Sequence, residues 1–345
     1  MAFYSLSARV ADNANLIQRR RINRVSEPGR TSGPSLLAIE KESISACFVS
    51  ILQPRISDKS WIELRKRARN AQTTPYCLSL YGSYCVVFHL ESRLGYWLLL
   101  GNTRHCGLWE KDTIWPFPVN KGQRAMEEKL HNRLGLKPGS KVLDAGAGSG
   151  YVAMYMAEKG LDVTAIDITP LHVESAKRNV KYRGLQDKIS VHLEDYHNLT
   201  RFADNSFDGI YTMETFVHAD DPVKVLRNFY RILRPGGVLV QHEADWNKNS
   251  ELLQEVLRLS HCQNTLEQGA LSRTLEQVGF KSIDLEDLSE RVLPFWRFLG
   301  WVGYIPYQIL RPFNLQSRFT NILAAVAVYQ HWDEGRYISV RAVKP

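Results

Sequence analysis

Glycines at alternate positions after an acidic residue mark a candidate ligand-binding turn. Gly146, Gly148 and Gly150 follow Asp144, which closes a short aliphatic run. Such a turn from a strand into a helix needs glycine because the missing Cβ lets the backbone approach a ligand closely. A second apolar run ends in Asp167, about 20 residues beyond the turn, where a carboxylate accepts hydrogen bonds from the ribose hydroxyls of a bound nucleoside. The spacing therefore predicts nucleoside binding.

Regular elements around this turn would hold the two acids at one edge of a sheet. Residues 141–143 and 163–166 are typical of strands, and residues 151–159 predict a helix with a buried face. Residues 189–193 predict a third strand, which is followed by Glu194, Asp195 and Tyr196. A third acid thus falls in register with the first two, as expected for repeated strand and helix units.

The glycine spacing separates two cofactor classes. A dinucleotide turn with the pattern GxGxxG would need glycine where this chain has Tyr151. The acid-first pattern DxGxGxG instead resembles the first motif of the class I methyltransferases that use S-adenosylmethionine (SAM). In that family the turn holds the amino-acid end of the cofactor, the acid after the second strand binds the ribose, and the acid after the third contacts adenine. The resemblance implies these cofactor-binding residues: Asp144, Ala145, Gly146, Ala147, Gly148, Gly150, Asp167, Ile168, Asp195, Tyr196 and Met213.

The same resemblance implies an α/β fold, a Rossmann-like, seven-stranded and mostly parallel sheet with helices on both faces and aromatic-rich lid segments. Thr169 is the expected N-cap of a helix from Pro170, and Asp221 with Pro222 is expected to start another. The remaining expected helices are 123–134, 223–233, 251–260 and 263–278, and the remaining expected strands are 207–212, 238–241, 282–285 and 337–343. An Arg-Pro-Gly-Gly turn at 234–237, which recurs in this family, precedes the strand 238–241.

Glu214 and His218 are the candidate catalytic residues. They follow the fourth predicted strand, and the carboxyl ends of parallel strands form the binding edge of such a sheet. Four residues apart, they would lie on one side of a helical turn. The segment resembles the Glu-x-x-x-His stretch of sterol methyltransferases, which implies a role in orienting substrate or accepting a proton. The alternative is structural, with Glu214 capping a local turn and His218 packing.

Two aromatic segments flank the predicted cofactor fold. Residues 95–118 are too irregular for one helix or strand, and with Asn-Thr-Arg-His at 102–105 they resemble the sterol C-methyltransferase branch, where this region encloses the cofactor and an apolar substrate. The candidate substrate-contacting residues are Tyr96, Trp97, His105 and Trp109. In the second segment, 292–310, Arg297 and Pro306 interrupt the apolar run, and the uncharged stretch 298–310 is too short to span a bilayer. It would form a substrate wall, an interfacial membrane contact or ordinary core.

Charge and composition divide the chain into three parts. Residues 1–92 are a basic extension whose elements the pattern does not define, 93–140 hold the aromatic lid segment and a helix, and 141–345 form the SAM-binding domain with an apolar insertion at about 290–335. The net charge is +8, and residues 1–75 hold 13 Lys or Arg against 6 Asp or Glu. The catalytic part therefore lacks the basic field that a nucleic-acid partner requires. The basic arm with Arg19, Arg20, Arg21 and Arg24 is either solvated disorder or a targeting or membrane-surface element.

The cysteines indicate the redox compartment. Five cysteines without a CxxC pair argue for a reducing environment and against a disulfide framework or a zinc site. His242-Glu243 lacks a second histidine at helical spacing, so no metal is expected there. We expect a cytoplasmic protein that either is free or lies peripherally on an intracellular membrane.

These observations predict a SAM-dependent methyltransferase acting on a small lipophilic metabolite, such as a sterol, a terpenoid or another secondary metabolite. The sequence leaves C-, O- and N-methylation open and does not indicate an oligomeric state. The alternatives are a catalytically silent SAM-binding protein and an NAD-dependent oxidoreductase, and Tyr151 in the turn disfavours the latter.

Overall fold

The structure is a computed structural model of the 345-residue chain, and it describes residues 105–247, 251–259, 262, 267–316 and 319–345. All of these residues fall in one compact unit, Pro54–Pro345. The expectations for the extension 1–92, and for Tyr96, Trp97 and residues 102–104 of the first aromatic segment, lie outside the described residues.

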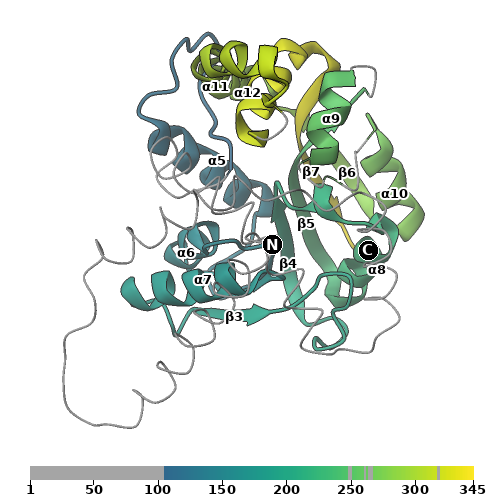
Figure 1. Cartoon of the computed structure of the whole chain (residues 1–345). Helices are drawn as coiled ribbons and strands as arrows, with labels where there is room; N and C mark the ends of the chain where they lie inside the picture. The colour runs from purple at the N-terminus through teal and green to yellow at the C-terminus, as the bar shows by residue number, and fades with distance from the viewer. Residues whose placement is uncertain (1–104, 248–250, 260–261, 263–266, 317–318) are drawn as a thin grey trace, which may run out of the picture. The chain divides into compact units, whose positions relative to one another are not determined.

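A seven-stranded sheet with the order β3-β2-β1-β4-β5-β7-β6 forms the centre of this unit (Figure 1). Each of the neighbours from β3 to β5 pairs in parallel, whereas β7 runs antiparallel to both β5 and β6. The strands are β1 Lys141–Ala145, β2 Asp162–Asp167, β3 Ile189–Leu193, β4 Phe207–Met213, β5 Leu233–Trp246, β6 Lys281–Asp287 and β7 Gly335–Val343. The mostly parallel Rossmann-like sheet predicted from the sequence is confirmed.

Helices cover both faces of the sheet, and two hydrophobic layers fill the space between. On one face, residues of α5, α6 and α7 pack on Val142, Val163 and Val240. On the other face, residues of α8 and α10 pack on Leu143, Ile210 and the β7 residues. The helices are α5 Val119–Leu134, α6 Tyr151–Glu158, α7 Pro170–Tyr182, α8 Pro222–Ile232, α9 Glu251–Leu259, α10 Ala270–Val278, α11 Ser289–Leu310 and α12 Thr320–Gln330.

Local signals located the starts of α6, α7, α8 and α9, whereas α5 begins at Val119 rather than at 123 and α10 begins at Ala270 rather than at 263. Asp221 caps α8 as expected, since its side chain accepts a hydrogen bond from the backbone of Lys224 at 3.0 Å. Thr169 occupies the N-cap position of α7, but its side chain makes no capping hydrogen bond. The expected turn at 234–237 lies inside the longer strand β5, where the pairing with β4 shifts register.

The second aromatic segment lies in one continuous helix, α11, which contains Pro294 and Pro306. This helix packs against α12 at the upper end of the view in Figure 1. None of the helices in the described part of the chain combines the length and apolarity needed to cross a membrane.

Candidate SAM-binding and catalytic site

The glycine turn after β1 has the conformation that its sequence predicted. Gly146, Gly148 and Gly150 all have positive φ, at 100°, 54° and 81°. A Cβ on Gly146 would lie 2.6 Å from the side chain of Thr215, so glycine at this position lets the turn and Thr215 pack closely against each other. A Cβ on Gly148 would meet nothing within 4 Å, so this residue borders open space. The middle of the turn therefore has room for a ligand against its backbone.

Asp167 at the end of β2 is a preorganised, ionised acceptor beside this turn. Its Oδ2 accepts a hydrogen bond from the Gly148 amide at 2.9 Å, and its Oδ1 accepts one from the Thr169 amide at 2.8 Å. Burial acts to raise the pKa of Asp167, but the hydrogen bond and charge of His172 and these amides outweigh it, so the pKa is lowered. Half-exposed Ile168 follows directly. A carboxylate and an apolar side chain thus occupy the positions expected for ribose and adenine contacts.

Asp144 differs from Asp167 in its electrostatics. It is buried in β1, and its Oδ2 has no hydrogen-bond partner. Burial raises the pKa of Asp144 to about 7, against the opposing influence of Tyr211. The carboxyl is therefore close to half-protonated at neutral pH, and its orphan oxygen is an acceptor or donor for a polar group entering beside the turn.

The third predicted acid also lies at the carboxyl edge of the sheet. Asp195 follows β3, and its Oδ1 accepts a hydrogen bond from the His197 amide at 2.9 Å and lies 2.7 Å from the His197 ring. Burial acts to raise the pKa of Asp195, but the bonds from His197 outweigh it and lower the pKa. The hydroxyl of Tyr196 donates to the carbonyl of Thr215 at 3.1 Å. The loop after β3 is thereby connected to the loop after β4.

Glu214 directly follows β4 in a conformation that is rare for a residue with a side chain, at a φ of 57°. Its Oε1 accepts hydrogen bonds from the Cys106 amide and from the Tyr337 hydroxyl, both at 2.7 Å. His218 is exposed and ends the short 3₁₀ helix η1 Phe216–His218, which begins after Glu214. The expectation that both residues share one helical turn is therefore wrong, because Glu214 belongs to the strand end and to the left-handed region.

Glu243 is a site residue that sequence reasoning missed. It is buried in β5, and its Oε1 accepts hydrogen bonds from the Phe216 amide at 2.8 Å, the Thr215 amide at 3.2 Å and the Thr212 hydroxyl at 3.1 Å. Burial raises the pKa of Glu243 to about 8, so the carboxyl is largely protonated at neutral pH. It holds the loop that carries Glu214. The sequence signal is an acid near the end of a buried strand at the sheet's binding edge, and no local pattern indicates its partners in the loop after β4.

His105 and Trp109 lie inside the protein. His105 is 4% exposed, and its Nε2 lies 3.4 Å from the Glu127 carboxylate of α5. Burial acts to lower the pKa of His105. The hydrogen bond and the charge of Glu127 act in the opposite direction and outweigh burial, so the pKa is raised above its ordinary value. The ring of Trp109 stacks on Phe295 with centroids 6.0 Å apart and fills the space above Gly122. Trp109 thus fixes the aromatic segment to α5 and α11.

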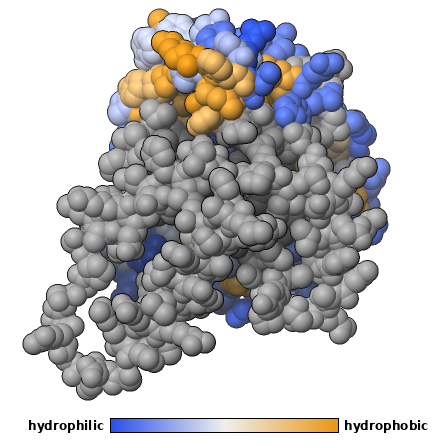
Figure 2. Space-filling view, viewed as in Figure 1, coloured by the Kyte–Doolittle hydropathy of each residue, from blue (hydrophilic) through white to orange (hydrophobic). Residues whose placement is uncertain are grey.

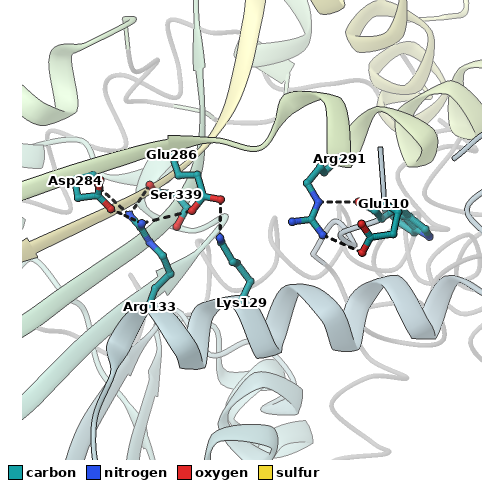
Figure 3. A network of polar contacts seen from close by, with 8 residues as sticks. Glu110, Lys129, Arg133, Asp284, Glu286, Arg291 and Ser339 are labelled. Carbon is teal, nitrogen blue, oxygen red and sulfur yellow. Dashed lines mark hydrogen bonds and ion pairs between the residues drawn. The ribbon is translucent and has the colours of Figure 1, made fainter. Parts of the chain in front are cut away.

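A polar network holds the same segment and α5 against the antiparallel end of the sheet (Figure 3). Arg291 donates to the backbone carbonyl of Trp109 at 2.9 Å, and Lys129 of α5 pairs with Glu286 of β6 at 2.6 Å. Arg133 pairs with Asp284 and also donates to the Ser339 carbonyl at 3.0 Å. The aromatic segment and α5 are therefore fixed to α11 and to the antiparallel end of the sheet by charge as well as by packing.

A cavity of about 500 Å³ lies away from these residues, at the amino ends of β1 to β4. Its lining includes Lys141, Asp162, Ile189 and Phe207, which are the first residues of β1, β2, β3 and β4. Open parallel sheets bind ligands at the carboxyl ends of their strands, where the glycine turn and the acids converge. The edge with the turn is therefore the candidate cofactor site. In the described part of the chain, no three His, Cys, Asp or Glu residues lie close enough to hold a metal ion.

Comparison with known proteins defines the family. A family model described as "Methyltransferase domain" matches residues 143–241. The S-adenosyl-L-methionine-dependent Diels-Alderase iccD of Talaromyces variabilis is 35% identical over 268 residues, which cover 74% of this chain and 92% of that protein. The chain therefore belongs to the class I SAM-dependent methyltransferase superfamily.

More distant relatives extend this comparison. The sterol 24-C-methyltransferase ERG6A of Gibberella zeae is 30% identical over 193 residues, covering 52% of this chain and 50% of that protein. The crystal structure of the [4+2]-cyclase SpnF matches with a TM-score of 0.61 at 22% identity, over 75% of this chain and 94% of that chain. The similarity to the S-adenosyl-L-methionine-dependent Diels-Alderase supports SAM as the cofactor, and the turn with its open space at Gly148 and the ionised Asp167 fits it.

Proposed function

We propose that this chain is a SAM-dependent enzyme that catalyses an intramolecular cycloaddition of a diene and an alkene within one lipophilic, polyunsaturated metabolite. The similarity to the Talaromyces variabilis Diels-Alderase carries the proposal. That similarity covers nearly the whole relative and reaches well beyond the methyltransferase domain at 143–241. The similarity to the sterol methyltransferase covers only about half of each chain.

The chemistry of the site suits this reaction. A cycloaddition forms two carbon–carbon σ bonds from π electrons of the same molecule, so no proton and no leaving group has to be removed. The enzyme then has to fold the substrate and stabilise charge that develops on an activating carbonyl. Glu214 already accepts two hydrogen bonds from the protein, and Glu243 is largely protonated at neutral pH, so neither is arranged as a strong base.

The proposed contacts to SAM follow the residues at the carboxyl edge. Asp167 would accept the ribose hydroxyls, Ile168, Asp195 and Tyr196 would border the adenine, and the turn from Asp144 to Gly150 with Met213 would hold the amino-acid end. When bound, SAM supplies a positive sulfonium at the substrate side of this edge. The residues of the chain orient that charge and exclude water from it.

Methyl transfer is the second candidate, and the placement of Glu214 and His218 favours it. Both lie in the loop between β4 and α8, at the sheet's binding edge. His218 is exposed, and an imidazole can act as a general base near neutral pH. In this reaction the methyl group leaves the sulfonium, a new bond forms to carbon, oxygen or nitrogen of the substrate, and any released proton passes to the base.

One experiment separates the two reactions. The purified full chain is incubated with SAM bearing a labelled methyl group and a lipophilic extract of polyunsaturated metabolites, and products are analysed by mass spectrometry. A cycloaddition yields an isomer of unchanged mass with SAM recovered intact. Methyl transfer yields a labelled product and an equivalent amount of demethylated cofactor. Binding of SAM without either product would overturn both candidates and identify a SAM-binding protein without this chemistry.

A further inference from the structure

The strongest feature that the site does not use is an exposed apolar surface on α11, which we call the α11 surface. It consists of large hydrophobic side chains on α11, on the following short helix η2 Arg311–Phe313 and on the neighbouring aromatic segment: Ile114, Trp115, Phe117, Trp301, Val302, Tyr304, Ile305, Ile309 and Phe313. Figure 2 shows apolar side chains gathered at the end of the molecule where Figure 1 places α11 and α12. Patches of this kind mark interaction sites.

The packing of α11 is the reverse of that of an ordinary core helix. Its contact with α12 is made through glycines, since a Cβ on Gly300 would lie 2.6 Å from Tyr329 and one on Gly303 would lie 3.2 Å from Ala325. Ile305, in the same part of the helix, is 69% exposed. From Gly300 onward α11 therefore buries glycines and exposes large side chains, whereas its first turns, with buried Phe295, belong to the core. Core packing thus does not account for the apolar composition of the C-terminal part of this helix.

The aromatic segment extends the same surface. Trp115 contacts Trp301 edge-on with ring centroids 5.3 Å apart, and Phe117 contacts Phe298 in the same way at 4.8 Å. Trp301, Ile305 and Ile309 follow one another at intervals of four along α11 and share one side of it. Two segments almost two hundred residues apart in sequence thus form one continuous apolar face.

Arginine dominates the charge of α11 and of the segment that follows it, and the aromatic segment carries the exposed acid Asp112. Residues 291–332 include four arginines and no aspartate or glutamate. The nearest acids at the start of α11 are neutralised, because Glu290 pairs with Lys111 at 2.9 Å and Glu110 lies 3.5 Å from Arg291. Arg311 is exposed beside Phe313. An apolar face bordered by arginine, with no uncompensated acid on its own helix, is complementary to an anionic lipid surface.

We propose that the α11 surface inserts into the interfacial region of a membrane that contains anionic lipids, with α11 lying in the membrane plane. The aromatic side chains would enter the boundary between headgroups and acyl chains, and Arg297 and Arg311 would contact lipid phosphates. Trp109 of the aromatic segment stacks on Phe295 of α11, and the nearby Cys106 amide donates to Glu214 of the proposed site. A lipophilic substrate dissolved in the bilayer would therefore reach the enzyme without crossing water.

Vesicle sedimentation with the full chain tests the proposal. The vesicles contain phosphatidylcholine alone or phosphatidylcholine with phosphatidylserine, and the variants are Ile305→Gln with Ile309→Gln, and Arg311→Gln. Tyr182→Gln is the matched control, because Tyr182 is a large exposed side chain at the end of α7, away from α11. SAM binding by each variant checks that the fold is intact.

We expect binding to the anionic vesicles that the double variant weakens by about tenfold or more, while Tyr182→Gln leaves it unchanged. Arg311→Gln should weaken binding to anionic vesicles several-fold and leave the weaker binding to neutral vesicles unaltered. Equal binding of the double variant and the unmodified chain would overturn the proposal, since basic residues elsewhere, such as those in 1–75, would then carry the interaction. A concentration-dependent dimer that the double variant abolishes, without vesicle binding, would assign the surface to a second copy instead.

Discussion

The hydroxyl of Tyr337 donates a hydrogen bond to Glu214 at 2.7 Å and thereby joins the last strand of the chain to the loop at the sheet's binding edge. The same carboxylate oxygen accepts a hydrogen bond from the backbone amide of Cys106, which lies near the start of the described part of the aromatic segment. Glu214 therefore connects three segments that are distant in sequence. Burial raises the pKa of Tyr337 well above its ordinary value, so the phenol remains a donor throughout the physiological range.

Removing the Tyr337 hydroxyl tests this connection. Tyr337→Phe should lower the free energy of unfolding by about 1–3 kcal/mol, because the Glu214 carboxylate is left with one protein donor. Combining it with Glu214→Gln in a double-mutant cycle should give a coupling energy above about 0.5 kcal/mol, measured by denaturant unfolding. Strictly additive effects would show that the bond contributes nothing to stability. Slower turnover with unchanged SAM affinity in both single variants would place the pair beside the substrate as well.

Two glycines of the turn should respond differently to alanine. Gly148→Ala places a methyl group in open space, so it should cost only about 1–2 kcal/mol of backbone strain yet weaken SAM binding by about tenfold or more. Gly146→Ala should destabilise the fold severely, because its Cβ would overlap Thr215. Calorimetric SAM titrations alongside melting curves distinguish the two. An unaltered SAM affinity in Gly148→Ala would contradict the cofactor site.

Asp167 should contribute to cofactor affinity through its charge. Asp167→Asn keeps the size of the side chain but replaces an ionised acceptor, so SAM and its demethylated product should both bind more weakly by about 1.5–3 kcal/mol. Isothermal calorimetry gives these affinities directly. Tighter binding of NAD than of SAM by the unmodified chain would contradict the cofactor assignment.

Glu243 should make stability fall as the pH rises. Its pKa is about 8 in the folded protein, above the ordinary value of 4.5, so the folded state binds more protons than the unfolded state between these values. The stabilisation that Glu243 gives the folded state is fully present below about pH 4.5 and is lost as the pH rises through about 8. Glu243→Gln should remove this dependence. We compare the free energy of unfolding of the variant with that of the unmodified chain. This difference should shift in favour of the variant by more than about 1 kcal/mol between pH 5 and pH 9.

Unfolding measured by denaturant at a series of pH values tests this expectation. Asp144, whose pKa is about 7, contributes in the same direction and serves as an internal reference, since Glu243→Gln leaves its part unchanged. Parallel stability curves for the variant and the unmodified chain would contradict a protonated Glu243.

His218 reports on which reaction occurs. Because the side chain is exposed, His218→Ala should leave the melting temperature and the SAM affinity nearly unchanged. Methyl transfer that uses His218 as a base should then slow by about tenfold or more. A cycloaddition should proceed at a similar rate, since no proton is transferred. Single-turnover assays with the product identified by mass separate these outcomes.

The parts of the site that depend on local sequence could be predicted. The turn after β1, the acids after β2 and β3, and the cap at Asp221 each follow from patterns within a few residues, and the structure places them as expected. Glu243 reaches its partners in the loop after β4 because β5 pairs with β4, across 27 to 31 positions, and Tyr337 reaches Glu214 across 123 positions. Trp109 stacks on Phe295, a partner that only the packing of α11 supplies. No pattern around these residues encodes such distant neighbours.

The position of β7 in the sheet bears on how the protein can be made in the cell. β7 lies between β5 and β6 but follows both in the chain, starting only at Gly335. A nascent chain that has emerged as far as α12 has an open edge on β5 and an unpaired β6, and such edges pair readily with other chains. The Tyr337 hydroxyl is also absent from Glu214 at that stage. Folding of this unit must therefore finish after nearly all of it has left the ribosome, and chaperones that shield strand edges should be associated with it until then.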